Sequence, residues 1–298
     1  MMLSRQTTAW LGRGPFLGAA LATWLAPAPL DLVPAVLGLV LFGVTHGALD
    51  HQIGAEARST TRFVVRYLGG IGCFLLFWLA APAVAIAGFF VLSADHFGEC
   101  EFVRLRGRPP LGWRERAPAL FWGLAVSLLA ALTHWTESLP GLRQMLRAPL
   151  FAASLPAFVP PAAAVVLCLV ALLAASHHGA PAVSATLPLL LVLAALPQIP
   201  GFLCFFAFWH SLDSIAQQRA ERGLSLADYL KQGAPLAAVA WAGLFFLRAV
   251  AGHGVGQLDF YPALFLLLAA LTVSHAAVMR RFYTAHAIKD HGLLESPA

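Results

Sequence analysis

Apolar residues fill long stretches of this chain, and short polar segments separate one stretch from the next. The stretches run approximately over residues 14–30, 33–50, 64–94, 117–134, 155–175, 184–212, 235–251 and 261–279. An α-helix rises about 1.5 Å per residue, so a helix of about 20 apolar residues crosses the hydrocarbon core of a bilayer. Because such stretches recur along the whole length, the sequence predicts an all-α, polytopic transmembrane helix bundle with one membrane domain over residues 1–298.

Two of the stretches, 64–94 and 184–212, are longer than one crossing requires. Pro82 interrupts the first, and Pro197 and Pro200 interrupt the second, at positions where proline breaks or kinks a helix. If each long stretch is a hairpin, the chain crosses the membrane ten times. If each is one tilted helix, the chain crosses eight times.

The distribution of arginine and lysine favours ten crossings with a cytoplasmic N-terminus. In that arrangement the basic residues within 58–66, 104–116, 219–231 and 280–289 all lie on the cytoplasmic side. With eight crossings the arginines of 104–116 move to the side opposite those of 58–66, and the positive-inside bias weakens.

Composition agrees with a membrane protein, since 59% of the residues are hydrophobic and 11% are charged. The net charge of +5 lies mostly in short gaps between apolar stretches, so topology explains it and no nucleic-acid partner is predicted. The four cysteines are far apart and indicate no disulfide framework. The first apolar stretch, which follows Arg5 and Arg13, loosely resembles a signal peptide, but its late position favours a first transmembrane helix.

Eleven histidines need an explanation in so apolar a chain, because an ionisable side chain at membrane depth is costly and usually faces a partner or the bundle interior. His46, His96, His210 and His275 lie at or near the ends of even-numbered crossings, on the cytoplasmic side of the ten-crossing topology. The helix dipole or the interface would explain any one of them alone. Together they predict a layer of imidazoles, a ligand type that suits Fe, Zn, Cu or Ni.

Acidic residues accompany two of these histidines. Asp50 follows His46 by four residues, so on a helix its carboxylate would accept the imidazole N–H and fix the ligand tautomer. Glu101 follows His96 and is predicted to support it in the same way, with ordinary interfacial charge as the alternative.

Aromatic residues also lie close in sequence to the histidines. Phe42, Phe97, Phe206 and Trp209 are predicted to line a tunnel for a long lipid-soluble molecule. Core packing or an interfacial aromatic belt is the alternative explanation.

Four short motifs together resemble those of one protein family. They are His46-Gly47-Ala48-Leu49-Asp50-His51, His96-Phe97-Gly98 with an acid at Glu101, Trp209-His210-Ser211, and Leu271-Thr272-Val273-Ser274-His275. In this order they resemble the successive motifs of the Brp/Blh family of bacterial and archaeal membrane β-carotene 15,15′-dioxygenases. The resemblance spans positions 46–275, which is most of the chain.

The resemblance implies a multi-pass oxidoreductase of the bacterial inner membrane. It implies that O₂ cleaves β-carotene at the central double bond into two retinals, at a non-haem Fe(2+) held by histidines alone. It also implies that retinal passes to a rhodopsin-type protein. Carried over by position, His46, His96 and His210 are the expected iron ligands.

The chain departs from the family pattern at one expected ligand. Where the family has a histidine four residues after the Trp-His-Ser histidine, this chain has Ser214, and a hydroxyl is a poor Fe(2+) ligand. His275 resembles the histidine of the family's late Pro-His motif, with Ser274 in place of the proline, and is the first candidate replacement; His51, His177 and Asp213 follow.

Other functional classes fit the sequence less well. A membrane di-iron desaturase needs repeated HxxHH boxes and a zinc intramembrane protease needs HExxH, and the sequence has neither. A transporter would use the proline interruptions as broken helices around a binding site. A carotenoid-binding or retinal-binding protein without catalytic activity is the remaining alternative, because Ser214 departs from the ligand pattern.

The topology makes a prediction that labelling can test. We expect both termini and the arginine-rich 96–116 segment on the cytoplasmic side. In a protein lacking its native cysteines, Thr60→Cys and Arg108→Cys should both resist a membrane-impermeant thiol reagent in intact cells and react after lysis. Reaction of the two positions from opposite sides would reject the ten-crossing topology.

Overall fold

Prolines break both of the long apolar stretches in two. The computed structural model describes residues 13–53, 60–147, 155–254 and 259–291. Helix α5 (Thr60–Ala80) ends just before α6 (Pro82–Arg106) begins, and α10 (Ala180–Ala195) is separated from α11 (Gln198–Cys204) at Pro197. In each pair a proline occupies a position in the first turn or immediately before it, where its missing N–H costs no helical hydrogen bond.

The other elements within the described ranges are also helical. They are α2 (Gly14–Leu25), α3 (Leu32–Gly38), the π-helical η1 (Leu39–Gly43), the 3₁₀ turn η2 (Thr45–Gly47), α4 (Asp50–Ile53), α7 (Trp113–Thr133), α8 (Trp135–Leu146), α9 (Val159–Ser176), the π-helical η3 (Phe205–Ser211), α12 (Leu212–Arg222), α13 (Leu226–Gly254) and α14 (Phe260–His291). Eight helical spans in this part of the chain are long and apolar enough to cross a membrane, and the apolar α2 and α10 are shorter. The predicted all-α, multi-pass fold is confirmed.

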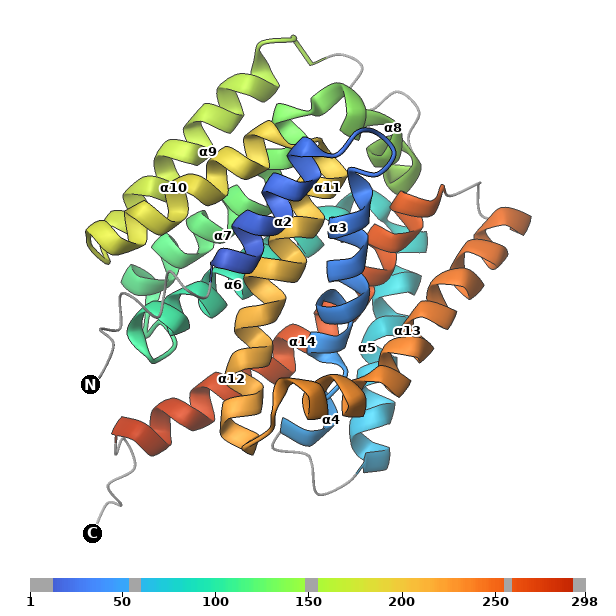
Figure 1. The fold of residues 1–298 in the computed structure, drawn as a ribbon. Coiled ribbons are helices and arrows are strands. Elements are labelled where there is room, and N and C mark those ends of the chain that lie inside the picture. The colour runs from blue at the N-terminus through green and yellow to red at the C-terminus, as the bar shows by residue number, and fades with distance from the viewer. Residues whose placement is uncertain (1–12, 54–59, 148–154, 255–258, 292–298) are drawn as a thin grey trace.

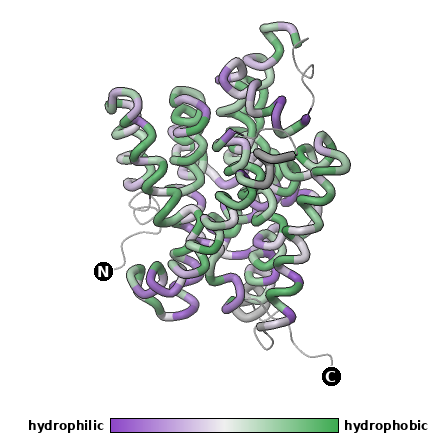
Figure 2. Tube along the Cα trace, turned by 90° about the vertical axis from the view of Figure 1, so that its right-hand side faces the viewer, coloured by the Kyte–Doolittle hydropathy of each residue, from purple (hydrophilic) through white to green (hydrophobic). Residues whose placement is uncertain are grey.

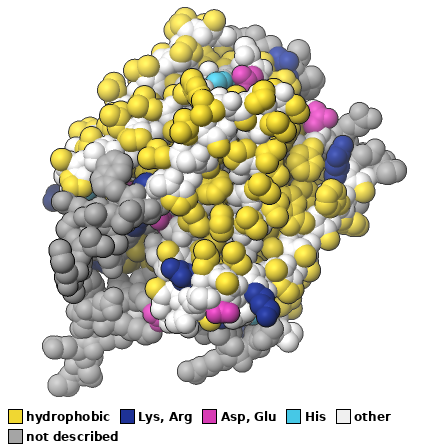
Figure 3. Space-filling model, viewed as in Figure 1, with side chains coloured by type: hydrophobic (Ala, Val, Ile, Leu, Met, Phe, Trp, Pro, Cys, Tyr) yellow, Lys and Arg dark blue, Asp and Glu magenta, His cyan; other side chains and the backbone are white. Residues whose placement is uncertain are grey.

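Three spans form the centre of the bundle, and others lie at its outside (Figure 1). More than half of the most apolar window is buried in α6, in the α11 to α12 span and in α14. In contrast, fewer than one residue in five is buried in α5 and in α13. Figure 2 shows mostly hydrophobic residues along the helices, and Figure 3 shows apolar side chains over most of one face. An apolar outer surface of this kind suits contact with lipid.

Helices α6 and α7 touch backbone to backbone through two glycines. A Cβ added at Gly98 would overlap the carbonyl oxygen of Ala119, and one added at Gly123 would overlap the carbonyl oxygen of Ala94. Small residues allow this close approach in membrane helices, where van der Waals packing drives association. Because His96 lies two residues before Gly98, the same contact fixes the position of that imidazole.

Charged residues from three distant segments meet at one end of the bundle. Arg13, immediately before α2, forms ion pairs with Glu101 at 3.2 Å and with Asp213 at 2.8 Å. Arg104 also pairs with Glu101, and the guanidinium of Arg13 lies 3.4 Å from the centre of the Trp209 ring. These contacts make α2 part of the folded bundle, and they place the start of the first apolar helix beside the ends of α6 and η3.

Helix α8 was not expected from the sequence. It is amphipathic and carries Glu137 and Arg143, so its average hydropathy does not mark it as a membrane segment. It nevertheless packs against α6 and α14, and Trp78 donates a hydrogen bond of 2.7 Å from Nε1 to the Met145 carbonyl. A sliding-window hydropathy average detects membrane crossings, but it misses amphipathic helices such as α8 because their polar residues lower the average.

Two alanine substitutions on α6 test the contact between α6 and α7. Gly98→Ala should destabilise the protein, because overpacking against backbone costs about 1–3 kcal/mol. Gly88→Ala on the same helix should be neutral or slightly stabilising, because an added Cβ there meets nothing within 4 Å. Thermal unfolding of the detergent-solubilised variants measures both effects. Equal melting temperatures for the two variants would argue against backbone contact at Gly98.

Candidate metal centre

Four imidazoles from four helical segments meet in the interior of the bundle. The ring centre of His46 lies 5.1 Å from that of His210 and 4.6 Å from that of His275. The ring centre of His96 lies 5.0 Å from that of His210 and 5.1 Å from that of His275. All four side chains are buried, so the structure brings the four predicted histidines into one closed ring of contacts.

Two of these histidines lie in irregular helical turns. His210 lies within π-helical η3, and His46 lies in the 3₁₀ turn η2 that follows π-helical η1. A π turn inserts an extra residue and rotates the side chains that follow it, and such turns are frequent at functional sites. Segments η1 and η3 pack against each other, and Gly43 leaves room there for the Phe206 ring.

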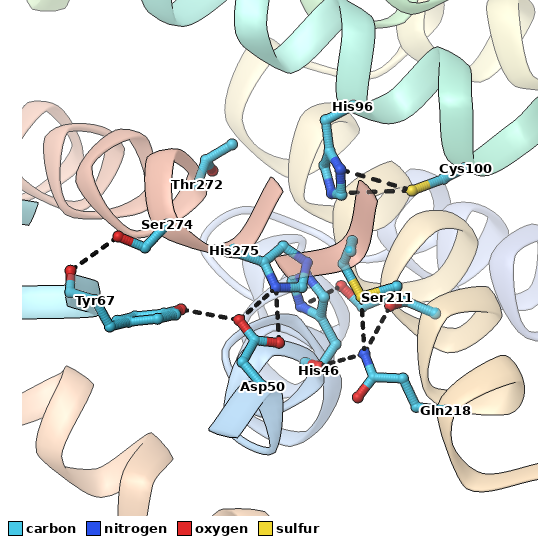
Figure 4. Close-up of polar contacts among 12 residues, drawn as sticks. His46, Asp50, Tyr67, His96, Cys100, Ser211, Gln218, Thr272, Ser274 and His275 are labelled. Carbon is cyan, nitrogen blue, oxygen red and sulfur yellow. Dashed lines mark hydrogen bonds and ion pairs between the residues drawn. The ribbon is translucent and has the colours of Figure 1, made fainter. Parts of the chain in front are cut away.

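Hydrogen bonds fix the orientation of two rings (Figure 4). His46 donates from Nδ1 to the Gly43 carbonyl, and the Ser211 hydroxyl lies 3.2 Å from the same nitrogen. His275 donates from Nδ1 to the Asp50 carboxylate at 2.9 Å. A ring nitrogen bonded in this way keeps its proton, which leaves Nε2 unprotonated and able to bind a metal.

The donor set has the chemistry that a metal ion needs. Within the described residues, Nε2 of His210 and Nε2 of His275 are buried and have no hydrogen-bond partner. One ring nitrogen from each of His46, His210 and His275 lies within 4.8 Å of the other two. Metal–imidazole bonds of about 2.0–2.1 Å place two nitrogens on one ion at most about 4.2 Å apart. Small side-chain movements therefore suffice for these three residues, which fit a metal ion, and the His96 ring lies about 5 Å from the rings of His210 and His275.

The partner of Asp50 differs from the sequence prediction. The carboxylate was expected to face His46, four residues earlier, but it bonds His275 and accepts a hydrogen bond of 3.1 Å from Tyr67. The physical reason is that the chain leaves regular α-helix between 39 and 49, so positions 46 and 50 do not share a helical face. The predicted supporting role stays with Asp50 but acts on a different histidine.

Glu101 does not support His96 in the predicted way. Its carboxylate is used by Arg13, by Arg104 and by Nε1 of Trp209, the last at 3.2 Å. The guanidinium groups of the buried Arg13 and the partly buried Arg104 compete for this carboxylate more strongly than a neutral imidazole does. His96 instead has the Cys100 sulfur at 3.8 Å from its Nδ1, and this sulfur accepts a hydrogen bond from Tyr283.

Ser214, at the departure from the family pattern, belongs to a hydrogen-bond network that reaches the backbone of His46. Its hydroxyl accepts a bond of 3.1 Å from the Gln218 amide, which also donates to the His46 carbonyl at 3.0 Å. Tyr229 donates to the same carbonyl at 2.9 Å. Ser214 thus helps to hold the backbone of one histidine, and the other three imidazoles reach the ring without it.

An apolar cavity of about 610 Å³ opens from the histidine ring. All four histidines line one part of it, and leucine, valine, isoleucine and phenylalanine side chains form most of the remaining wall. Phe97 and Phe206 are among the lining residues, in line with the predicted tunnel.

Phe42 and Trp209 are not among the residues that line this cavity, which corrects the tunnel prediction for them. Phe42 packs edge-on against Phe208, and Trp209 packs against Phe16 beneath the Arg13 guanidinium. Residues next to each other on a helix point to different faces, so closeness in sequence to a histidine did not decide which aromatic rings face the cavity.

Three polar residues at the site were missed by sequence reasoning. Tyr67 bonds Asp50, and Gln218 and Tyr229 hold the backbone of His46. The only available signal was their polar character within or beside apolar helices, which does not identify a partner far away in sequence.

Comparison with known proteins identifies the family of this chain. A protein-family model described as beta-carotene 15,15'-dioxygenase matches residues 37–283 and so includes all four histidines of the ring. Neither curated proteins nor solved structures gave a significant match. Because the family model covers most of the chain, the resemblance drawn from the motifs is confirmed, and the chain belongs to the β-carotene 15,15′-dioxygenase family.

Proposed function

We propose that this protein is a membrane-embedded non-haem iron dioxygenase that cleaves β-carotene at its central double bond. One observation carries the proposal: four buried imidazoles form one wall of an apolar cavity of about 610 Å³. A metal-binding group next to an apolar cavity suits oxidation of a hydrocarbon, and membership of the family supplies the class of substrate. In the proposed reaction the double bond breaks and each of its carbons receives one atom of O₂, which gives two retinals.

His46, His96, His210 and His275 would hold the ion, which we propose to be Fe(2+). Imidazole donors suit iron but also suit zinc, copper and nickel, so the choice of iron rests on the resemblance of the motifs and not on the donor set. When bound, the iron supplies the redox chemistry that O₂ cleavage requires.

The residues of the chain orient the donors and exclude water. Asp50 accepts the Nδ1 proton of His275, and the Gly43 carbonyl accepts that of His46, so both rings are held in a single tautomer. Phe97 and Phe206 pack against the His210 ring, with ring centres 4.7 Å and 5.8 Å away. These aromatic contacts keep the polyene side of the site apolar and limit the access of water.

We further propose that the protein is a multi-pass component of a bacterial inner membrane. Its substrate and product are both lipid-soluble, which agrees with the apolar outer surface of α5 and α13. The retinal would then pass to a rhodopsin-type protein in the same membrane.

Expression in a bacterium that accumulates β-carotene tests the activity. We expect loss of colour and formation of retinal, measured by chromatography, and we expect His96→Ala to abolish both. His134→Ala is the matched control, since that imidazole bonds the Ala194 carbonyl and lies outside the ring of four. If carotene co-purifies with the protein and no retinal forms, the protein binds carotenoid without cleaving it, and the proposed reaction is wrong.

Iron content tests the assignment of His275 as the fourth ligand. His275→Ala should lower iron affinity by more than the roughly 10- to 100-fold typical of losing a supporting residue, because it removes a donor outright. Ser214→Ala should retain iron, since the Ser214 hydroxyl bonds Gln218. Elemental analysis of the purified variants gives iron per chain. Full iron occupancy in His275→Ala would leave a site of three histidines.

A further inference from the structure

The apolar cavity reaches the outer surface of the bundle at one place. Among its lining residues, four large apolar side chains are exposed: Val64 and Leu68 on α5, at 42% and 59%, and Leu236 and Val239 on α13, at 45% and 67%. Both helices pack against α14, whose Leu267 and Leu271 are half-buried and line the cavity between them. The opening therefore lies between α5 and α13.

The surroundings of this opening are apolar on both sides. Helices α5 and α13 are the two least buried of the candidate membrane spans, so their outer faces are the ones that contact lipid. Val65 and Phe246, which are exposed on the same two helices, continue the apolar surface. Apolar surroundings on both sides of the opening suit a molecule that enters from the bilayer.

We propose that the gap between α5 and α13 is a lateral mouth through which a long, apolar polyene passes from the bilayer to the histidine ring. This inference rests on the proposed function and adds the route of the substrate. A polyene crossing water would expose its whole apolar surface at about 25 cal/mol per Å², whereas a lateral mouth keeps that surface in an apolar medium throughout.

The mouth lies at the level of the histidines. Val64 and Leu68 are on the first turns of α5, and Tyr67 between them reaches inward to Asp50. On α13, Gly243 lines the cavity, and a Cβ added there would meet no atom within 4 Å. Small and aliphatic side chains thus line the cavity from the outer face to His275. The His275 ring is hydrogen-bonded to Asp50, the partner of Tyr67.

Tryptophan substitutions at the mouth test the route. Leu68→Trp and Val239→Trp place a large ring across the opening. Leu76→Trp and Val65→Trp are matched controls, since these residues are 67% and 65% exposed and do not line the cavity. The proteins are placed in phosphatidylcholine nanodiscs, mixed under argon with vesicles that contain β-carotene, and recovered at intervals. Bound β-carotene per chain, corrected for empty nanodiscs, gives the rate of uptake without turnover.

We expect the two mouth variants to take up β-carotene about tenfold more slowly than wild type, which corresponds to about 1.4 kcal/mol on the barrier to passage. The control variants should take up β-carotene at the wild-type rate. Leu68→Ala, which widens the opening, should take it up at least as fast as wild type. Iron content equal to that of wild type shows that each variant is folded.

Two results would reject the proposal of a lateral mouth. One is uptake by Leu68→Trp and Val239→Trp at the wild-type rate, and the other is no uptake by wild type above that of empty nanodiscs. Failure of the proposed reaction gives a different result, in which wild type takes up β-carotene and the mouth variants are slow, but no retinal forms when air is admitted.

Discussion

The need to satisfy buried imidazole nitrogens governs the centre of this bundle. A buried polar group without a hydrogen bond costs about 1–3 kcal/mol, and water is scarce at this depth. The Nδ1 atoms of His46 and His275 are bonded by the Gly43 carbonyl and by Asp50, but Nε2 of His210 and of His275 has no hydrogen-bond partner in the described structure. An ion held between the rings, as proposed above, would satisfy both of these nitrogens.

Departures from regular helix make this arrangement possible. An unbroken α-helix from 32 to 53 would place His46 and Asp50 on one face, where the Asp50 carboxylate would contact the His46 ring. The successive π and 3₁₀ turns η1 and η2 place His46 and Asp50 on different faces. Asp50 bonds His275, which lies 225 residues later in the chain. Gly47 contributes as well, because a Cβ at that position would lie 3.2 Å from Nδ1 of His275.

The same helices that hold the donors also decide what reaches them. The central spans carry His96, His210 and His275 and are well buried, whereas α5 and α13 contribute side chains that face both the cavity and the outside. The charged cluster of Arg13, Glu101 and Asp213 lies on another side of the His210 segment, where it joins α2 to the ends of α6 and η3. The site thus has a charged side that fixes helix ends and an apolar side that suits a hydrocarbon substrate.

Much of the fold followed from sequence, because crossing a bilayer imposes a simple rule of length and apolarity on each helix. The prolines at 82 and 197 marked the breaks, and the four histidines were identified among the eleven by their positions at the ends of predicted crossings and by the motifs that contain them. The amphipathic α8 was not predicted by that rule, because its apolar residues cover only one of its faces.

The tertiary structure decided which groups touch one another. The pairing of Asp50 with His275, of Glu101 with arginine, and of Tyr67 with Asp50 each joins distant segments or depends on irregular helix geometry. For the same reason the sequence could place Phe42 and Trp209 near the histidines but could not show that neither residue lines the cavity. Hydropathy and spacing determine that a helix exists and how deep its residues lie, whereas its rotation and its neighbours depend on packing between helices.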